Sequence, residues 1–256
     1  MRRALLHGAA ALLAAFLMLP ELAIVPAAFG ARSYLQLPPQ QWSLHWWGAF
    51  FADPSWRRAL ATSLLLAATT AVIAVVAGTA AALGLARLRA RARALAAALL
   101  LGPAVVPTIV LAVALYGLAL RIGMAGTFAG LALAHAMLAL PYAVLTIRVS
   151  LDALDARLLQ AAAGLGAGSA RVLRTVTLPL ILPGIAGAAV FGFVTSFDEV
   201  VLSIFLAGPQ VRTLPVRLWE EIRVELTPVT AVAATLMIVL ALAAGALGQA
   251  MRRRAA

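Results

Sequence analysis

Asp198 and Glu199 are the residues whose type and position point most directly to chemistry. They are adjacent carboxylic acids within an apolar stretch from Leu180 to Leu206. Inserting a carboxylate into a membrane costs on the order of 2.5 to 3.5 kcal/mol on insertion scales. A pair of them in one span therefore indicates a functional or structural role. Either acid could offset the charge of a cation on a path between helices, or the pair could hold helices together through internal ion pairs. Successive helical residues point about 100° apart, so we expect one acid to face a path and the other to pair with an arginine or a backbone donor.

The other side chains exclude several kinds of chemistry. The chain has no cysteine and no lysine, which excludes thiolate metal sites, cysteine nucleophiles and a lysine-dependent phosphate loop. We therefore expect no enzyme activity, no catalytic residue, no metal and no cofactor, and any energy source must lie on another polypeptide. His135 is a lone histidine in an apolar segment, either a proton relay or a hydrogen-bonded packing residue, and we expect the second. Glu21 has no assigned role.

The elements that carry these residues are predicted to be membrane-spanning helices. The chain is 64% hydrophobic and 11% charged, and its apolar runs can cross about 30 Å of hydrocarbon, which takes about 20 helical residues. This composition predicts an all-α, polytopic transmembrane bundle in one domain, residues 1–256. We expect six spans, at residues 8–29, 60–86, 95–120, 126–147, 180–206 and 228–250. The first run is expected to be a retained span and not a signal peptide, because Pro20 and Glu21 interrupt it.

Proline and small residues predict how these spans run and pack. Pro103 and Pro107 in the third span and Pro141 in the fourth each remove a helical hydrogen bond, so we expect kinks there. The second and sixth spans are rich in alanine and glycine, which lets helices approach one another closely in lipid.

The arginines predict the orientation of the chain in the membrane. The net charge is +11, and cationic residues are retained in cytoplasmic loops. With the N-terminus inside, thirteen of the twenty arginines fall on the cytoplasmic side and seven on the outer side. This distribution predicts that both termini are cytoplasmic. The run RLRARAR at 87–93 is interpreted as a topological anchor at a short inner loop, and not as a site for a polyanion such as nucleic acid.

A polar, helix-forming segment interrupts the apolar runs after the fourth span. Asp155 can cap a first short helix, Gly166 can end it in the left-handed conformation, and Ser169 can cap a second one. Pro179 and Pro183 stand near the start of the fifth span, where proline costs little. An apolar stripe on the first helix is formed by Leu158, Ala162 and Leu165. Such a bent pair could seat in a groove of a soluble partner or rest on the inner leaflet, and the residues alone support both.

The same segment resembles the cytoplasmic coupling loop of permease subunits of type I ATP-binding-cassette importers. That loop has the pattern Glu-Ala-Ala, three residues, Gly, nine residues, Ile, one residue, Leu-Pro. The spacing is kept throughout. Gln160, which carries no charge for an ion pair, replaces the glutamate, and Val176 replaces the isoleucine. The positions in register are Gln160, Ala161, Ala162, Gly166, Leu178 and Pro179. With PAVVPTIVLAVALYGL at 103–118 and LPYAVLTIRVSLDALD at 140–155, the resemblance covers about residues 57–250, a MetI-like core whose coupling loop is 149–179.

The resemblance implies an importer permease in the bacterial inner membrane. It implies three partners: a separate ATP-binding subunit dimer that seats on the loop, a second permease subunit, homologous or identical, and a periplasmic solute-binding protein. The segment TSFDEVVLSIFLAGPQVRTLPVRLWEEIR at 195–223 is similar to spermidine/putrescine-type permeases, which implies a polyamine or a related small solute. The alternative is an ion-gradient-driven secondary transporter, which would show internal repeats with broken helices and a paired ionisable relay.

Overall fold

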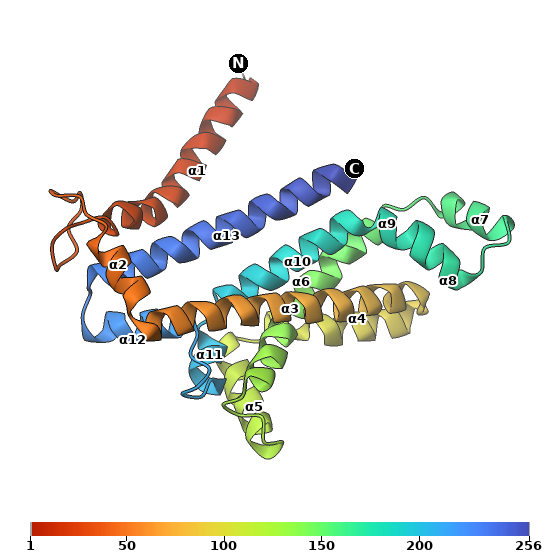
Figure 1. Ribbon diagram of the computed structural model, residues 1–256. Coiled ribbons are helices and arrows are strands. Elements are labelled where there is room, and N and C mark those ends of the chain that lie inside the picture. Colours follow the sequence, from red (N-terminus) through yellow and green to blue (C-terminus); the bar gives the residue numbers. More distant parts are fainter. Residues whose placement is uncertain (1, 256) are drawn as a thin grey trace. The chain divides into compact units, whose positions relative to one another are not determined.

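A computed structural model describes residues 2–255, and the regular structure within that range is helical (Figure 1). Extended pairing among these residues is confined to an isolated bridge between Gly30 and Trp42. The all-α prediction is therefore confirmed. The chain forms two compact units, Met1–Leu60 with Leu214–Leu240, and Ala61–Thr213 with Ala241–Ala256.

Six membrane spans were predicted, and the apolar helices provide between three and six candidates. Three segments are long and apolar enough to cross a membrane by themselves: α3 (Pro54–Arg87), α6 (Phe128–Asp152) and the Pro228–Met251 part of α13 (Pro228–Ala255). Three more reach that length only as bent pairs. These are Leu6–Leu19 with Glu21–Ala27 inside α1 (Arg2–Ala27), α4 (Ala90–Val105) with α5 (Thr108–Arg121), and Ser169–Leu180 with α10 (Leu182–Phe197). Counting each bent pair as one span gives six.

The first unit has a folded segment around the start of α3. Here α2 (His45–Ala52) precedes α3, and α12 (Leu214–Val224) supplies Arg217. The Arg217 guanidinium lies 4.7 Å from the Trp56 ring centroid and 2.8 Å from a Glu221 carboxylate oxygen. Asp53 Oδ1 accepts a hydrogen bond from the Ser55 backbone N–H at 2.7 Å. This bond is the main reason why the pKa of Asp53 lies below its usual value, and the charge of Arg217 lowers it further.

The second unit is built around α6, which is buried along most of its length. One half of α6 packs with α5, α11 (Val201–Leu206) and Leu66 of α3. The other half packs against α3 and α10 through small residues. A β-carbon at Gly78 would lie 2.8 Å from Ala143 Cβ, and one at Gly192 would lie 3.1 Å from Ala71 Cα. Glycine and alanine therefore bring the helix backbones together, as expected in lipid.

The prolines act differently in the two spans where kinks were predicted. In the third span, α4 ends at Val105, Pro107 precedes α5, and the two helices meet at 104°. This is a full break. In the fourth span, α6 continues through Pro141, so the predicted kink does not interrupt the helix. Pro141 is buried, and the buried side chains before and after it pack against neighbouring helices, which support the helix across the missing hydrogen bond.

Candidate functional site

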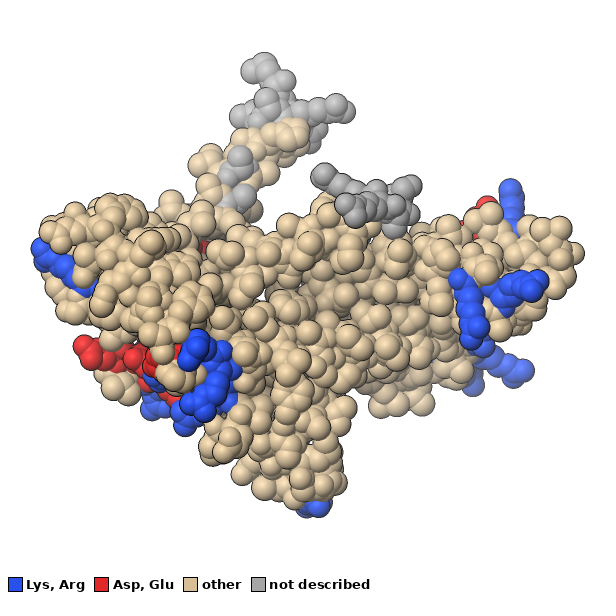
Figure 2. Space-filling model, in the orientation of Figure 1, with Lys and Arg blue, Asp and Glu red and all other residues tan. Residues whose placement is uncertain are grey.

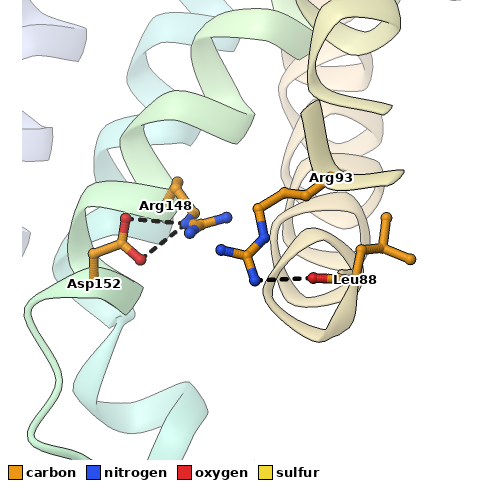
Figure 3. A network of polar contacts seen from close by, with 4 residues as sticks. All are labelled: Leu88, Arg93, Arg148 and Asp152. Atoms are coloured by element: carbon orange, nitrogen blue, oxygen red, sulfur yellow. Dashed lines mark hydrogen bonds and ion pairs between the residues drawn. The ribbon is translucent and has the colours of Figure 1, made fainter. Parts of the chain in front are cut away.

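Helix α6 continues to Asp152, so the first residues of the predicted loop 149–179 are helical. Arg148 and Asp152 close the last turn of α6, with Arg148 Nε at 2.9 and 3.0 Å from the two carboxylate oxygens (Figure 3). In the same view Arg93, near the start of α4, donates to the Leu88 carbonyl at 2.9 Å. The first loop helix, α7 (Ala156–Gly164), is capped by Asp155, whose carboxylate accepts from the Arg157 N–H at 2.9 Å. The predicted cap is confirmed.

Gly166 ends α7 in the left-handed conformation, with φ of +81°. The Gly166 N–H donates to the Ala163 carbonyl at 2.9 Å, and the Ala167 N–H donates to the Ala162 carbonyl at 3.1 Å. These two bonds form a Schellman motif, in which the left-handed residue is usually glycine. The spacing from Ala162 to Gly166 therefore has a local physical reason. It sets the point at which α7 stops and the chain turns.

The second loop helix starts one residue earlier than predicted. Gly168 is extended and occupies the cap position of α8 (Ser169–Val172), so Ser169 is the first helical residue and its side chain makes no capping bond. The prediction for Ser169 is wrong because glycine had already supplied the extended residue. A π-helical turn, Leu173–Thr177, follows α8, and α9 (Leu178–Leu180) ends at the break before α10. Pro179 and Pro183 lie in the first turns of α9 and α10, as predicted.

The surface of α7 faces away from the core of its unit. Gln160 and Ala161 are exposed, and Leu165 is 89% exposed. The predicted stripe is therefore an accessible apolar surface, in which Ala162 is half-buried. Arginines gather at this end of the second unit, over α7 and α8 (Figure 2).

The base of the loop is tied to the core and encloses a hollow. Leu154 and Leu178 pack against the cluster that contains Ile147 and Ile181, and Ile181 is fully buried at the 66° bend between α9 and α10. A hollow of about 580 Å³ lies between the loop and the end of α3. Its lining includes Leu83, Ala86, Arg87, Leu159, Ala163 and Leu173. The two ends of the loop, Leu154 and Leu178, are therefore packed against the same cluster as Ile181.

The fifth span is not the continuous helix that was predicted over residues 180–206. It begins after a bend at Ile181, and α10 ends at Phe197. Asp198 is the C-cap of α10 and is exposed, Glu199 is half-buried, and α11 begins at Val201. The two acids therefore lie in a helix break, and the expected 100° separation of neighbours on one helix does not apply.

Glu199 explains how a carboxylate is tolerated in this break. Its Oε1 accepts a hydrogen bond from the Leu202 N–H at 2.9 Å, in the first turn of α11. The carboxylate thus satisfies a backbone donor that no helical carbonyl reaches, at the end of the helix where negative charge is favoured. The expectation that one acid pairs with a backbone donor is confirmed for Glu199.

His135 is fully buried and bonded through both ring nitrogens. Nδ1 lies 2.9 Å from Ser196 Oγ, and Nε2 lies 3.1 Å from Ser203 Oγ. Ser196 Oγ also lies 3.1 Å from Thr70 Oγ1. The prediction of a hydrogen-bonded packing residue is confirmed.

Sequence reasoning missed the two serines and the threonine. The available signal was the position of Ser196 and Ser203 on either side of the acidic pair. Within residues that the structure describes, no three His, Asp or Glu side chains gather in a way that could hold a metal ion.

Residues 74–256 match the family described as "Binding-protein-dependent transport system inner membrane component". The chain belongs to this family. The spermidine/putrescine transport system permease protein PotC of Haemophilus influenzae is 33% identical over 240 residues, which are 94% of this chain and 93% of that protein. The putrescine transport system permease protein PotI of Escherichia coli is 31% identical over 230 residues, covering 87% of this chain and 82% of that protein.

A solved structure agrees with this assignment at the level of the fold. A chain of a bacterial alginate ABC transporter, crystallised in complex with an alginate pentasaccharide-bound periplasmic protein, superposes with a TM-score of 0.73. The match covers 99% of this permease and 96% of that chain, at 16% identity. The protein is therefore the membrane-embedded permease subunit of an ATP-binding-cassette importer, and the alternative of a secondary transporter is set aside.

Proposed function

We propose that this permease imports a polyamine such as spermidine or putrescine, or a related small cation, and that the α10–α11 break forms part of the path. The observation that carries the proposal is the exposed carboxylate of Asp198 at the end of α10, beside the half-buried Glu199. The names of PotC and PotI support a cationic solute, because both relatives are polyamine permeases.

The break suits a cation for a second electrostatic reason. The C-terminal end of a helix carries partial negative charge from its unpaired carbonyls. The 16-residue helix α10 ends at Phe197, so its negative end and the Asp198 carboxylate act at the same place. The first turn of α11 would oppose a cation, but Glu199 already binds an N–H of that turn. We therefore propose that the Asp198 carboxylate contacts the solute directly. The Glu199 carboxylate would add negative charge beside the solute without contacting it.

We further propose that ATP hydrolysis takes place on a separate ATP-binding subunit dimer, which seats on the loop 149–179. The proposed contacts are with Gln160, Ala161, Ala162 and Gly166, and Leu178 and Pro179 link the loop to α10. The exposed surface of α7 and the packed base of the loop support this role. Gln160 is uncharged, so its contact would be a neutral hydrogen bond and not an ion pair. Movement of the docked loop would tilt α10 as a rigid element and switch access to the break.

The remaining partners and the orientation complete the proposal. A periplasmic solute-binding protein would deliver the solute on the outer side, and a second permease subunit would complete the path. The periplasmic protein named with the alginate transporter supports the first of these. A span count of six, which counts each bent pair as one span, and the excess of arginine in the predicted inner segments support an inner-membrane protein with both termini in the cytoplasm.

Uptake of radiolabelled spermidine by the reconstituted importer tests the role of the break. We expect Asp198→Asn to raise the KM for spermidine about tenfold or more, because a hydrogen bond to a charged group contributes about 1.5 to 3 kcal/mol. Glu199→Gln should have a smaller effect, because an amide oxygen can still accept from Leu202. Glu225→Gln is the matched control, since it neutralises an exposed acid after α12. Normal uptake by both break variants, with intact assembly, would exclude the cation contact.

A further inference from the structure

A buried cluster of hydrogen-bonded side chains surrounds His135, and none of its members is among the proposed contacts with the solute or the ATP-binding subunits. Thr70 on α3, His135 on α6, Ser196 on α10 and Ser203 on α11 are all at most 4% exposed. Buried polar groups in a membrane protein are retained only when they are bonded, and here each member has a partner within 3.1 Å. The cluster therefore joins four helices at one point.

The position of this cluster is specific to the helix break. Ser196 is the second-last residue of α10, and Ser203 is the third residue of α11. Ser203 Oγ also donates to the backbone carbonyl of Glu199 at 3.1 Å. The two nitrogens of one imidazole thus bond to both sides of the break that carries Asp198 and Glu199.

We propose that His135 is a positioning residue for import, because it clamps α10 and α11 and so fixes where the two carboxylates lie. This inference rests on the proposed function for its effect on transport, but the clamp itself stands on geometry. A single rigid ring reaches two hydroxyls that are seven residues apart in the chain. The backbone bonds at the break, Asp198 N–H to the Val194 carbonyl and Ile204 N–H to the Val200 carbonyl, each stay on one side of it. Without the ring, the two helix ends lose their shared anchor on α6.

Substitutions of His135 can test its two hydrogen bonds, to Ser196 and to Ser203, separately. A glutamine amide can occupy the place of Nε2 and bond to Ser203, whereas an asparagine amide can occupy the place of Nδ1 and bond to Ser196. A leucine removes both bonds at similar volume. Ser196 and Ser203 each keep another partner after this change, Thr70 and the Glu199 carbonyl, so no hydroxyl is left without a bond. The leucine variant is therefore expected to fold.

The absence of cysteine from the chain allows the break to be probed directly. Val200→Cys places a thiol in the break, and its modification by a maleimide is followed by the mass of this subunit in the assembled importer. We expect His135→Leu to change the labelling rate at position 200 several-fold and His135→Gln to restore it, because Gln keeps the bond on the side of Glu199. His45→Leu is the control, since it removes an exposed histidine at the start of α2.

Import is measured on the same complexes with radiolabelled spermidine. We expect His135→Leu to raise the KM about fivefold to tenfold, with ATP hydrolysis and assembly unchanged, and His135→Gln to recover most of the loss. An unchanged labelling rate in His135→Leu would overturn the clamp whatever import does. A changed rate with unchanged KM, where Asp198→Asn raises it, would overturn the positioning role. The positioning role would also be overturned if His135→Leu, His135→Gln and His135→Asn lost import equally and changed its pH dependence. That result would favour a proton relay. If Asp198→Asn has no effect, the proposed function fails, and the labelling result still decides the clamp.

Discussion

Substitution of Gly166 tests whether the bent shape of the loop matters for coupling. A β-carbon at this position would meet no atom within 4 Å, so alanine there causes no clash. The penalty comes only from the backbone, whose φ is +81°. The left-handed conformation costs a residue with a β-carbon roughly 1 to 2 kcal/mol, which corresponds to about a fivefold to thirtyfold change in an equilibrium constant. Asparagine tolerates this conformation better. Gly168 offers a control, because it too has open space around it but has φ of −67°.

The assay compares these variants in the purified importer with its ATP-binding subunits. We expect Gly166→Ala to weaken binding of those subunits about fivefold to thirtyfold, as estimated from the backbone penalty. Gly166→Val should lose more and should import less solute per ATP hydrolysed, because a β-branched side chain is still less tolerant of positive φ. Gly166→Asn should lie close to the native protein, and Gly168→Ala should match it. If Gly166→Val retains native affinity and native import per ATP, the elbow at Gly166 is not the docking element.

Two further predictions concern stability. Gly184→Ala should lower the free energy of unfolding by about 1 to 3 kcal/mol, because the new β-carbon would lie 2.7 Å from Ser150 Cβ. Gly245→Ala is the control and should leave the free energy of unfolding unchanged, because its β-carbon would have no neighbour within 4 Å. Equal melting temperatures of the two variants in detergent would contradict the close packing of α6 and α10. The lowered pKa of Asp53 adds stability that is present above its ordinary value of 3.8 and is lost as the pH falls through the lowered value. Asp53→Asn should therefore flatten the profile of melting temperature against pH below about pH 5, and an unchanged profile would refute the contribution.

Predictions that depended on neighbouring residues in the chain were mostly confirmed. The cap at Asp155 and the left-handed end at Gly166 involve partners within a few residues, so their chemistry is visible in the sequence. The same holds for the prolines in the first turns of α9 and α10. The cap predicted at Ser169 was wrong because Gly168 competed for the same place, and a local pattern does not show which of two adjacent residues becomes extended.

The prediction of one continuous helix for the fifth span was wrong, because its breaks depend on residues far away in the chain. Its apolar residues predicted one continuous helix, but the chain bends at Ile181 and breaks after Phe197. The break is held by Ser196 and Ser203, which bond to His135 at separations of 61 and 68 residues. A hydrophobicity pattern measures how well a segment suits lipid and is insensitive to a polar partner on another helix.

The sequence by itself determined that this chain is a helical membrane protein, that its loop bends at Gly166, and that two acids stand in an apolar segment. These properties follow from composition and from the intrinsic conformational preferences of single residues. The tertiary structure alone decided that the acids lie in a helix break, that Glu199 accepts a hydrogen bond from the first turn of α11, and that His135 bonds to both sides of that break. Those features arise because buried polar groups in lipid must find partners inside the protein, and the partners come from helices far apart in the chain.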